Sequence, residues 1–511
     1  MGCRRWAAFL GLFSIRSRRL PHSPDSGGAS IFLRLRILKS LQNNDSIIAK
    51  QYNGNIILQE SYKTERTMLL EFSIENYKSF ADKATFSMEA APKQKGLDYS
   101  LHAIKVGRKT YKGLSSAVVY GPNAAGKTAI IGAMDTLKHI VMRGNVRDAE
   151  TMTSLDRAAF DLSFIPNSGL AVPKPVSFGI RFFEGGDLFE YNLKIDLGGF
   201  MDPSYGRAIV RETLLVNERM VFDREPEAVE LGDLDPAMFS GQVSDVFREN
   251  RAAAVKFLSV LDGEELFLTN GFKQIVSPKL SARVTGWFDR GLTVVYRADS
   301  LTTVQGAGLP DKAVYINKTI DTAAKEFGVS SNALGFVVPE GEGVPRLSSI
   351  FADEEGNLLR AVPAEDYESY GTVRFVNLFP LVAQAIATGG TLVVDEFDAS
   401  IHPMALMSIV SVFHNDEVNR RGAQLIFNTH NPVFLNGNVF RRDEIKFVER
   451  DRETGGSTCY ALSDFGTSGP SGVRKGDDYM KSYFVSRYGA IEDIDFTPVF
   501  EELMGDDGDG E

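Results

Sequence analysis

Three short apolar runs predict buried strands, and each ends in residues that carry chemistry. The runs cover residues 117–120, 391–394 and 425–427. Short apolar stretches bounded by turn-forming residues are typical of strands inside a sheet. A glycine-rich stretch follows the first run, two adjacent carboxylates follow the second, and Asn428-Thr429-His430 follows the third.

Other segments show the periods of half-buried strands and amphipathic helices. An alternating strand pattern begins at Met68, and residues 176–197 contain two alternating runs about Gly185-Gly186, which predicts a hairpin. Residues 243–261 and 313–327 have helical patterns, and an amphipathic helix is expected from the Glu368 region to just before Thr391. No heptad pattern persists over three or four repeats, which argues against a long coiled-coil arm.

These patterns predict an α/β protein, a mixed sheet flanked by helices, with a long inserted α+β arm or lid. Whether the insertion recognises a partner or only elaborates the structure stays open. The expected divisions are an N-terminal extension (1–67), a first lobe of the head (68–150), the insertion (151–360), a second lobe (361–495) and an acidic tail (496–511).

Composition and charge limit the cellular compartment and the class of partner that can be expected. The chain has 511 residues, of which 43% are hydrophobic and 24% charged, enough to bury a sizeable core. Its two cysteines, Cys3 and Cys459, give no disulfide framework, and no apolar run approaches the roughly 20 residues of a membrane helix. We therefore predict a cytoplasmic protein. The net charge of −11 argues against a surface devoted to nucleic acid, although a local basic groove stays open.

The first 67 residues differ from the rest in charge. They hold eleven basic and four acidic residues, a balance of +7. The start resembles a signal peptide, but Ser14-Ile15-Arg16-Ser17 follows where a cleavage site should be, which argues against export. We expect Met68 to be the natural start and 1–67 to be a largely disordered extension; a dispensable basic arm is the alternative.

The glycine-rich stretch after the first run predicts a phosphate-binding loop. It fits the pattern G-x-x-x-x-G-K-[ST] in full, with a strand before it and a helix after it. Its residues are Gly121, Pro122, Asn123, Ala124, Ala125, Gly126, Lys127 and Thr128. Inward-pointing N–H groups and the start of the helix would hold phosphate oxygens. Lys127 would neutralise phosphates, and Thr128 would bind Mg²⁺.

The other runs supply partners for this loop. We expect Asp395 to hold the metal and Glu396 to polarise the attacking water. His430, at the end of a neighbouring strand, could reach the γ-phosphate, and Ser369 and Gly371 at a helix start form a second anion site. The stretch Asn317-Lys318-Thr319-Ile320 lacks the aspartate of a guanine-binding motif, which favours ATP over GTP.

At these residues the sequence resembles the ABC-type ATPase superfamily, in the branch of RecF-like and chromosome-maintenance ATPases. It is most similar to the AbiL and RloA group of abortive-infection ATPases, often described as AAA-family ATP-binding proteins. The likeness extends from Met68 nearly to the end and includes FSIENYKSF, YGPNAAGKT, ESYGT, VVDEFDASIHP, NTHNP and KSYFVSRYGAI.

The resemblance assigns roles to individual positions. Ser369 and Gly371 correspond to the signature motif, Asp398 to the D-loop aspartate and His430 to the switch histidine. Tyr370 is bulkier than the family pattern has at its position, and no convincing Q-loop glutamine lies between the phosphate loop and the signature.

The resemblance also implies a homodimer or higher oligomer with ATP and Mg²⁺ in composite sites. The favoured function is the sensor or regulatory ATPase of an anti-phage abortive-infection system, controlling an effector encoded nearby, expected to be a nuclease. The alternative is a DNA-binding ATP switch of repair or chromosome maintenance. Transport is a third and weaker reading, since no docking partner at a membrane is evident.

Overall fold

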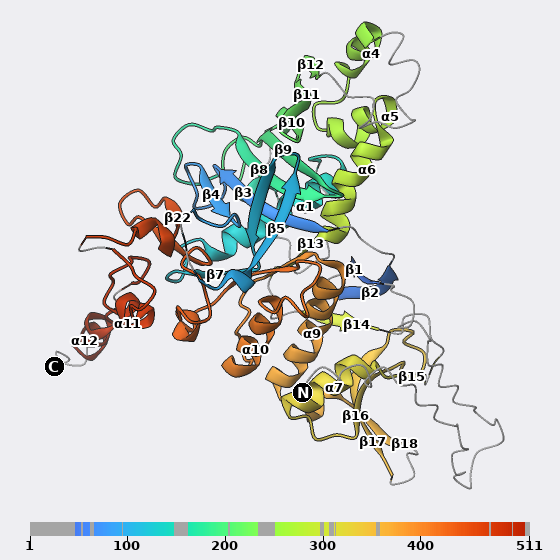
Figure 1. Ribbon diagram of the computed structural model, residues 1–511, viewed down its shortest axis with the longest axis vertical. Helices are drawn as coiled ribbons and strands as arrows, with labels where there is room; N and C mark the ends of the chain where they lie inside the picture. Colours follow the sequence, from blue (N-terminus) through green and yellow to red (C-terminus); the bar gives the residue numbers. More distant parts are fainter. Residues whose placement is uncertain are drawn as a thin grey trace, which may run out of the picture.

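The computed structural model contains a central mixed sheet, a large antiparallel sheet and smaller β elements (Figure 1). It describes residues 46–52, 55–61, 66–92, 94, 96–147, 162–202, 205–232, 251–296, 301–305, 311, 313–353, 358–469, 472–492 and 494–505.

The central sheet has the strand order β13-β19-β20-β7-β21-β22. Its strands are β7 (Ser116–Tyr120), β13 (Leu292–Val295), β19 (Thr391–Val394), β20 (Gln424–Asn428), β21 (Ile445–Arg450) and β22 (Ser457–Ala461). All neighbours pair in parallel except β22, which is antiparallel to β21. The predicted mixed sheet is confirmed. Because β7, β19 and β20 are parallel, the residues that follow them meet at one edge.

Helices cover both faces of this sheet. They are α1 (Lys127–Arg143), α9 (Tyr370–Thr388) and α10 (Pro403–Phe413). Successive strand residues point to opposite faces. Val119, Val393 and Ile426 accordingly belong to the core that includes α1, whereas Val118 and Phe427 belong to the core formed with α9 and α10. The middle residues of β7, β19 and β20 are apolar because both faces of these strands are buried.

The antiparallel sheet has the order β12-β11-β10-β9-β8-β3-β4 and lies above the central sheet in Figure 1. Its strands are β3 (Thr67–Glu75), β4 (Ala84–Ser87), β8 (Val176–Glu184), β9 (Asp187–Asp196), β10 (Ala208–Val216), β11 (Arg219–Glu225) and β12 (Ala228–Leu231). The predicted hairpin is confirmed, since Glu184 pairs with Asp187 and both intervening glycines have positive φ.

The interval 151–360 has the expected α+β content but does not form one separate arm. Strands β8 to β12 extend the antiparallel sheet, and β13 forms an edge of the central sheet. A four-stranded sheet lies apart at the bottom of Figure 1, with β15 (Val314–Tyr315), β16 (Ala333–Val337), β17 (Arg346–Ala352), β18 (Leu358–Pro363) and helix α7 (Lys318–Phe327). The helices α4 (Arg251–Leu258), α5 (Lys273–Ile275) and α6 (Pro278–Gly286) stack beside the antiparallel sheet.

The N-terminal segment departs from the expected disorder where it is described. Strands β1 (Ser46–Tyr52) and β2 (Asn55–Ser61) form a hairpin, and β14 (Thr302–Val304) pairs with β2 in parallel. The β1 strand also contacts α9. Residues 46–52 and 55–61 therefore form strands, which their isoleucine-rich runs favour, whereas the expected division at Met68 stays a prediction. Residues 1–45 lie outside the described part of the chain.

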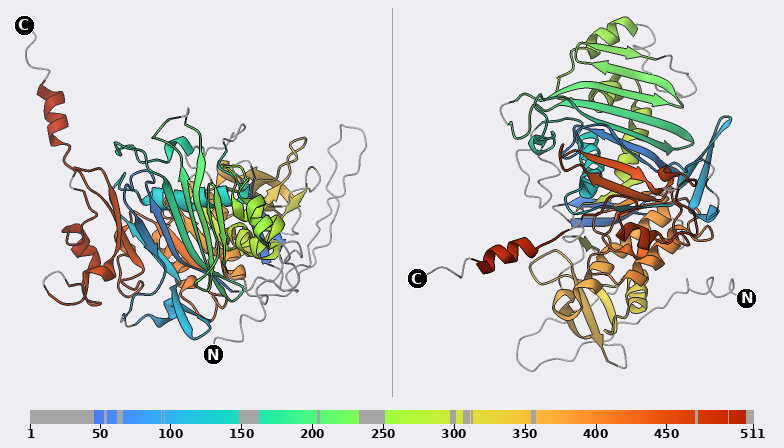
Figure 2. Two further views of the ribbon diagram at one scale, coloured as in Figure 1. Left: turned by 90° about the horizontal axis from the view of Figure 1, so that it is seen from above. Right: turned by 90° about the vertical axis from the view of Figure 1, so that its left-hand side faces the viewer.

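The remaining elements are peripheral. They are the hairpin of β5 (Leu101–Val106) and β6 (Lys109–Leu114), the short helix α8 (Ala364–Tyr367), and α11 (Tyr479–Phe484) and α12 (Thr497–Gly505) near the C-terminus. Helix α12 projects from the body in both views of Figure 2 and occupies most of the segment expected to be an acidic tail. None of the described helices has the length and apolar character needed to cross a membrane.

Candidate nucleotide site

The glycine-rich loop connects the end of β7 to the start of α1, as predicted. Gly126 is the N-cap of α1 with φ 112°, a conformation that favours glycine. A Cβ at Gly121 would lie 2.2 Å from the carbonyl oxygen of Val448, so β21 leaves no room for a side chain there. Ser457 Oγ on β22 donates a hydrogen bond to the carbonyl oxygen of Ala125 (2.6 Å). The two strands therefore hold the loop from behind.

The loop tip remains open. Asn123 and Ala124 are exposed, Pro122 is half-buried, and Ala124 has φ 59°. In this left-handed conformation the N–H group of a residue points in a different direction from the N–H groups of the residues beside it. Such a change of direction lets a loop curve around an anion.

Lys127 is buried at the base of the loop. Its Nζ donates hydrogen bonds to the carbonyl oxygens of Gly121 and Pro122, both at 2.8 Å. Burial lowers the pKa of Lys127 to about 8, although the carboxylates of Asp395 and Glu396 oppose this shift. The ammonium group is thus poorly solvated, and an incoming polyanion would stabilise its charge.

Thr128 and Asp395, the two residues predicted to bind Mg²⁺, contact each other directly. Thr128 Oγ1 donates to Asp395 Oδ1 at 3.0 Å, which joins the first turn of α1 to the end of β19. Asp395 is buried, and its Oδ1 also accepts a hydrogen bond from Asn428 Nδ2 at 2.5 Å. A hydroxyl beside a carboxylate is a hard oxygen donor set of the kind that Mg²⁺ prefers.

Glu396 is exposed beside this pair, in the left-handed region with φ 50°. Two contacts hold its backbone. Its N–H donates to Asn428 Oδ1, and its carbonyl oxygen accepts from Nη2 of the buried Arg374. The backbone is therefore fixed while the side chain stays exposed to solvent.

His430 and Asp398 lie within electrostatic range of the same centre. Burial and the charge of Lys127 lower the pKa of His430, whereas Asp398 and Glu396 oppose this shift. The imidazole is thus neutral near pH 7 and can donate or accept a hydrogen bond. The structure brings the phosphate loop, the acids and His430 to one edge of the sheet, as the sequence predicts.

Ser369 and Gly371 begin α9, as expected. Ser369 is the N-cap, and its Oγ accepts from Thr372 N–H at 3.1 Å. A Cβ at Gly371 would lie 2.2 Å from the carbonyl oxygen of Ser400, so this glycine is required by packing against the segment that follows Asp398. Tyr370, at the same helix end, is 57% exposed.

Two positioning residues were missed by sequence reasoning. Asn428 bridges Asp395 and the Glu396 backbone, and Arg374 holds that backbone from α9. The only signal for Asn428 was its place at the end of an apolar run next to His430; Arg374 carried none. Asn317, in the stretch compared with a guanine motif, caps α7 by accepting from Thr319 N–H at 3.0 Å.

The residues fit both expected ligands. The loop supplies N–H groups, an ammonium and the start of α1 for a triphosphate, and Thr128 with Asp395 supplies oxygens for Mg²⁺. Among the described residues no cluster of three or more His, Cys, Asp or Glu could hold a metal, so the pair would need phosphate and water to complete a coordination shell.

The fold and site define a P-loop NTPase: a mixed sheet flanked by helices, with a phosphate loop after β7 and an acidic pair after β19. The chain belongs to the family described as "AAA domain, putative AbiEii toxin, Type IV TA system", which matches residues 116–436, more than half of its length. Membership of the narrower AbiL and RloA group stays a prediction.

Solved structures with detectable similarity include the SMC head domain from Thermotoga maritima. That match has 12% identity and a TM-score of 0.32, and covers 77% of this chain and 98% of the other. The recombination mediator protein RecF of the RecFOR pathway matches with 10% identity and a TM-score of 0.31, covering 78% and 100%. Similarity at this level carries no argument about function. No curated protein matches the chain.

Proposed function

We propose that this protein is a Mg²⁺-dependent ATPase whose turnover regulates a partner effector in anti-phage abortive infection. The observation that carries the ATPase proposal is the contact between Thr128 and Asp395. The buried Lys127 precedes Thr128 in the chain, and the exposed Glu396 follows Asp395. Glu396 accepts the proton of the attacking water, and the neutral His430 positions the γ-phosphate. Bound Mg²⁺ would neutralise charge on the phosphate oxygens.

Substitution at Glu396 tests the hydrolysis step. Glu396→Gln should retain ATP binding and lose roughly 100-fold to 10,000-fold in kcat, because only the proton acceptor is removed. Lys127→Ala should instead weaken ATP binding. Glu365→Gln is a matched control, since Glu365 is also exposed but lies on α8. Hydrolysis by Glu396→Gln at the wild-type rate would contradict the assignment of the base.

We infer that two copies share ATP, with the start of α9 of one copy facing the phosphate loop of the other. Supporting this, Ser369 and Tyr370 are exposed at the N-terminus of a 19-residue helix, where phosphate binding is favoured. Gly371 is a poor site for a test because any side chain there meets Ser400 of the same chain. Tyr370 is better, since its side chain is largely exposed.

Tyr370→Glu places negative charge where the neighbour's phosphates would lie, so it should abolish hydrolysis without unfolding the chain. Tyr367→Glu is the matched control, because Tyr367 is 50% exposed on the preceding helix. Mixing Tyr370→Glu with Lys127→Ala should restore part of the activity, since one mixed site has every group intact. Normal hydrolysis by Tyr370→Glu alone would refute shared sites.

The defence role draws its support from the family description, which names an abortive-infection toxin. Cells that express the chain with its neighbouring gene should resist phage, and Glu396→Gln should change that resistance. A pull-down with the neighbouring gene product identifies the effector, expected to be a nuclease.

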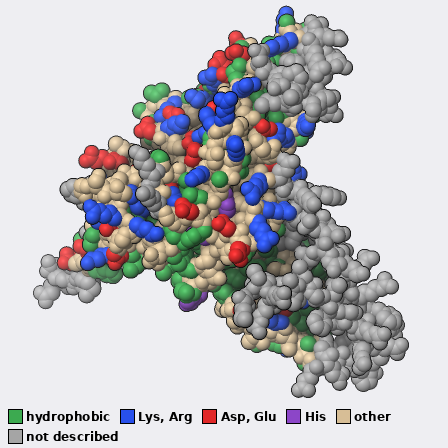
Figure 3. Space-filling view, in the orientation of Figure 1, with side chains coloured by type: hydrophobic (Ala, Val, Ile, Leu, Met, Phe, Trp, Pro, Cys, Tyr) green, Lys and Arg blue, Asp and Glu red, His purple; other side chains and the backbone are tan. Residues whose placement is uncertain are grey.

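The DNA-binding switch is the second candidate function. On the face drawn in Figure 3, acidic and basic side chains are interspersed. Stimulation of ATP hydrolysis by DNA, with no effect of the neighbouring product, would favour the DNA-binding switch instead.

A further inference from the structure

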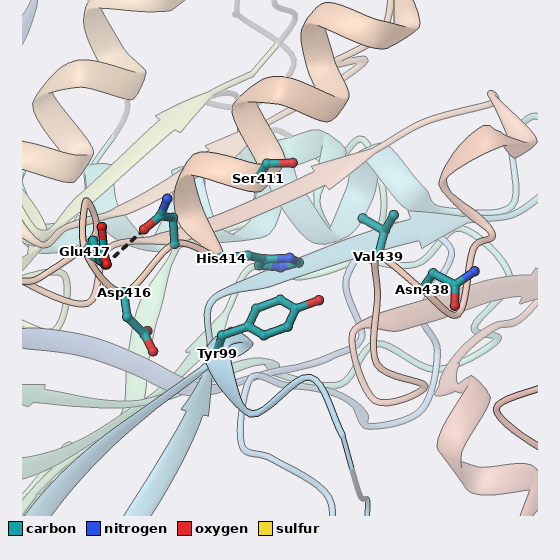
Figure 4. A pocket seen from close by; sticks show the side chains of 8 residues that line it. Tyr99, Ser411, His414, Asp416, Glu417, Asn438 and Val439 are labelled. Carbon is teal, nitrogen blue, oxygen red and sulfur yellow. Dashed lines mark hydrogen bonds between the residues drawn. The ribbon is translucent and has the colours of Figure 1, made fainter. Parts of the chain in front are cut away.

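A polar hollow lies at the end of the central strands that is opposite to the phosphate loop. It has a volume of about 430 Å³ and is shown in Figure 4. Its lining comes from the loop before β5, the end of α10, the residues after α10 and the loop before β21. Ser116, the first residue of β7, lies beneath it, whereas the phosphate loop follows the last residue of that strand. The hollow is therefore separate from the nucleotide site.

His414 forms the floor of the hollow, and its side chain is only 5% exposed. Its Nε2 lies 2.8 Å from Ser116 Oγ and 3.0 Å from Oε1 of the fully buried Glu444. Glu444 accepts hydrogen bonds from Ser116 Oγ and from Arg441 N–H. Because a buried carboxylate needs donors, the imidazole proton belongs on Nε2. Nδ1 is left as an acceptor without a partner among the described residues.

Two carboxylates among the lining residues are further acceptors. Asp416 and Glu417 are exposed, and neither carboxylate has an ion-pair partner within the described part of the chain. Tyr99 is 42% exposed, and its ring centroid lies 6.1 Å from that of His414, so the two rings stand side by side in Figure 4. An aromatic face, two carboxylates and an imidazole acceptor suit a cation that carries several N–H donors.

Two arginines lie near the rim without neutralising these acids. Arg420 Nε donates to the backbone carbonyl oxygen of Glu417, and Arg66 donates to the backbone carbonyl oxygen of Arg420. Both therefore bind backbone oxygens rather than the carboxylates.

We propose that this hollow binds a guanidinium group. The planar fork of five N–H donors can reach Nδ1 of His414 and the carboxylate of Glu417 while its face stacks on Tyr99. The group could belong to an arginine side chain of a partner protein or to a free guanidine compound. The chemistry of recognition is the same in both cases, and it does not depend on ATP hydrolysis.

Titration with three probes tests the proposal. The probes are a capped Gly-Arg-Gly peptide, the same peptide with citrulline in place of arginine, and agmatine. Binding is followed through the ring nitrogen shifts of His414 by NMR and through calorimetry. The arginine peptide or agmatine should bind saturably and shift the Nδ1 resonance, and the citrulline peptide, which has the same shape without charge, should not. Tighter binding of the peptide identifies a partner side chain, and tighter binding of agmatine identifies a free compound.

Substitutions at the rim provide the second arm. Glu417→Gln and Tyr99→Leu should each weaken binding about threefold to tenfold, because each removes one contact to the cation. Glu453→Gln, a matched exposed acid elsewhere, should leave it unchanged. Equal binding of the arginine and citrulline peptides, the absence of saturable binding by any charged probe, or equal affinities of Glu417→Gln and Glu453→Gln would overturn the proposal.

Discussion

The lowered pKa of Lys127 makes ATP affinity depend on pH in a direction that can be worked out. In the free protein the pKa is about 8, so the protonated fraction falls from about nine-tenths at pH 7 to about one-tenth at pH 9. Bound phosphates favour the charged form, so the complex keeps its proton. Because only the protonated protein is competent, the apparent Kd should rise about tenfold over this interval.

Calorimetry measures both the affinity and the proton. At about pH 9, ATP binding should take up close to one proton, seen as a heat that depends on the ionisation enthalpy of the buffer. Lys127→Arg is the matched control, because a guanidinium keeps its charge throughout and should flatten the pH dependence. An apparent Kd that is constant from about pH 7 to about pH 9, or an equal slope in Lys127→Arg, would refute the reasoning.

Affinity is a better readout here than thermal stability. Burial also lowers the pKa values of Lys138 and Lys446 below that of an exposed lysine. In each case the unfolded chain binds more protons, so all three lysines raise stability as pH increases. The contribution of Lys127 to stability cannot be separated from the others, whereas only groups that sense ATP affect its binding.

Two further predictions test the positioning residue and the N-terminal strands. Asn428→Ala should lower turnover about tenfold to 100-fold and raise the Mg²⁺ concentration needed for hydrolysis, because Asp395 Oδ1 loses the hydrogen bond that Asn428 Nδ2 donates to it. An unchanged Mg²⁺ titration would contradict this. Deletion of 1–45 should leave the melting temperature unchanged, whereas deletion of 1–65 should lower it by several degrees, since β14 loses its partner and α9 a contact. Equal melting temperatures of the two truncated chains would show that β1 and β2 contribute no stability.

The sequence predicts the phosphate loop and its acids well because their geometry is local. A strand, a glycine-rich turn and a helix follow one another without interruption between residues 116 and 143, so spacing alone determines where Lys127 and Thr128 point. The apolar runs ending at Asp395 and Asn428 are equally clear, because strands buried on both faces cannot alternate. Adjacent parallel strands then bring their ends together.

The missed features depend on contacts between distant segments. Strand β13 has an apolar run, but its partner β19 lies almost 100 residues further along the chain, so the sequence placed it in the insertion. The basic balance of 1–67 favoured disorder, although the isoleucines of 46–61 were a signal for strands. Arg374 has the character of an ordinary helix residue, and its role arises only where α9 packs against the segment after β19.

The packing of α9 on the segment after β19 allows a test of whether Arg374 acts on the ATP site of its own chain. Helix α9 touches the segment after β19 twice, through Arg374 at the Glu396 carbonyl and through Gly371 at the Ser400 carbonyl. Both contacts lie within one chain, so the loss of Arg374 should impair the site that contains the same chain's own Glu396. Mixing Arg374→Met with Lys127→Ala should therefore restore no ATP hydrolysis, in contrast to the Tyr370→Glu mixture. The reason is that the only mixed site with an intact phosphate loop belongs to the Arg374→Met copy, in which Glu396 is displaced. Recovery equal to that of the Tyr370→Glu mixture would place the effect of Arg374 on the neighbouring site instead.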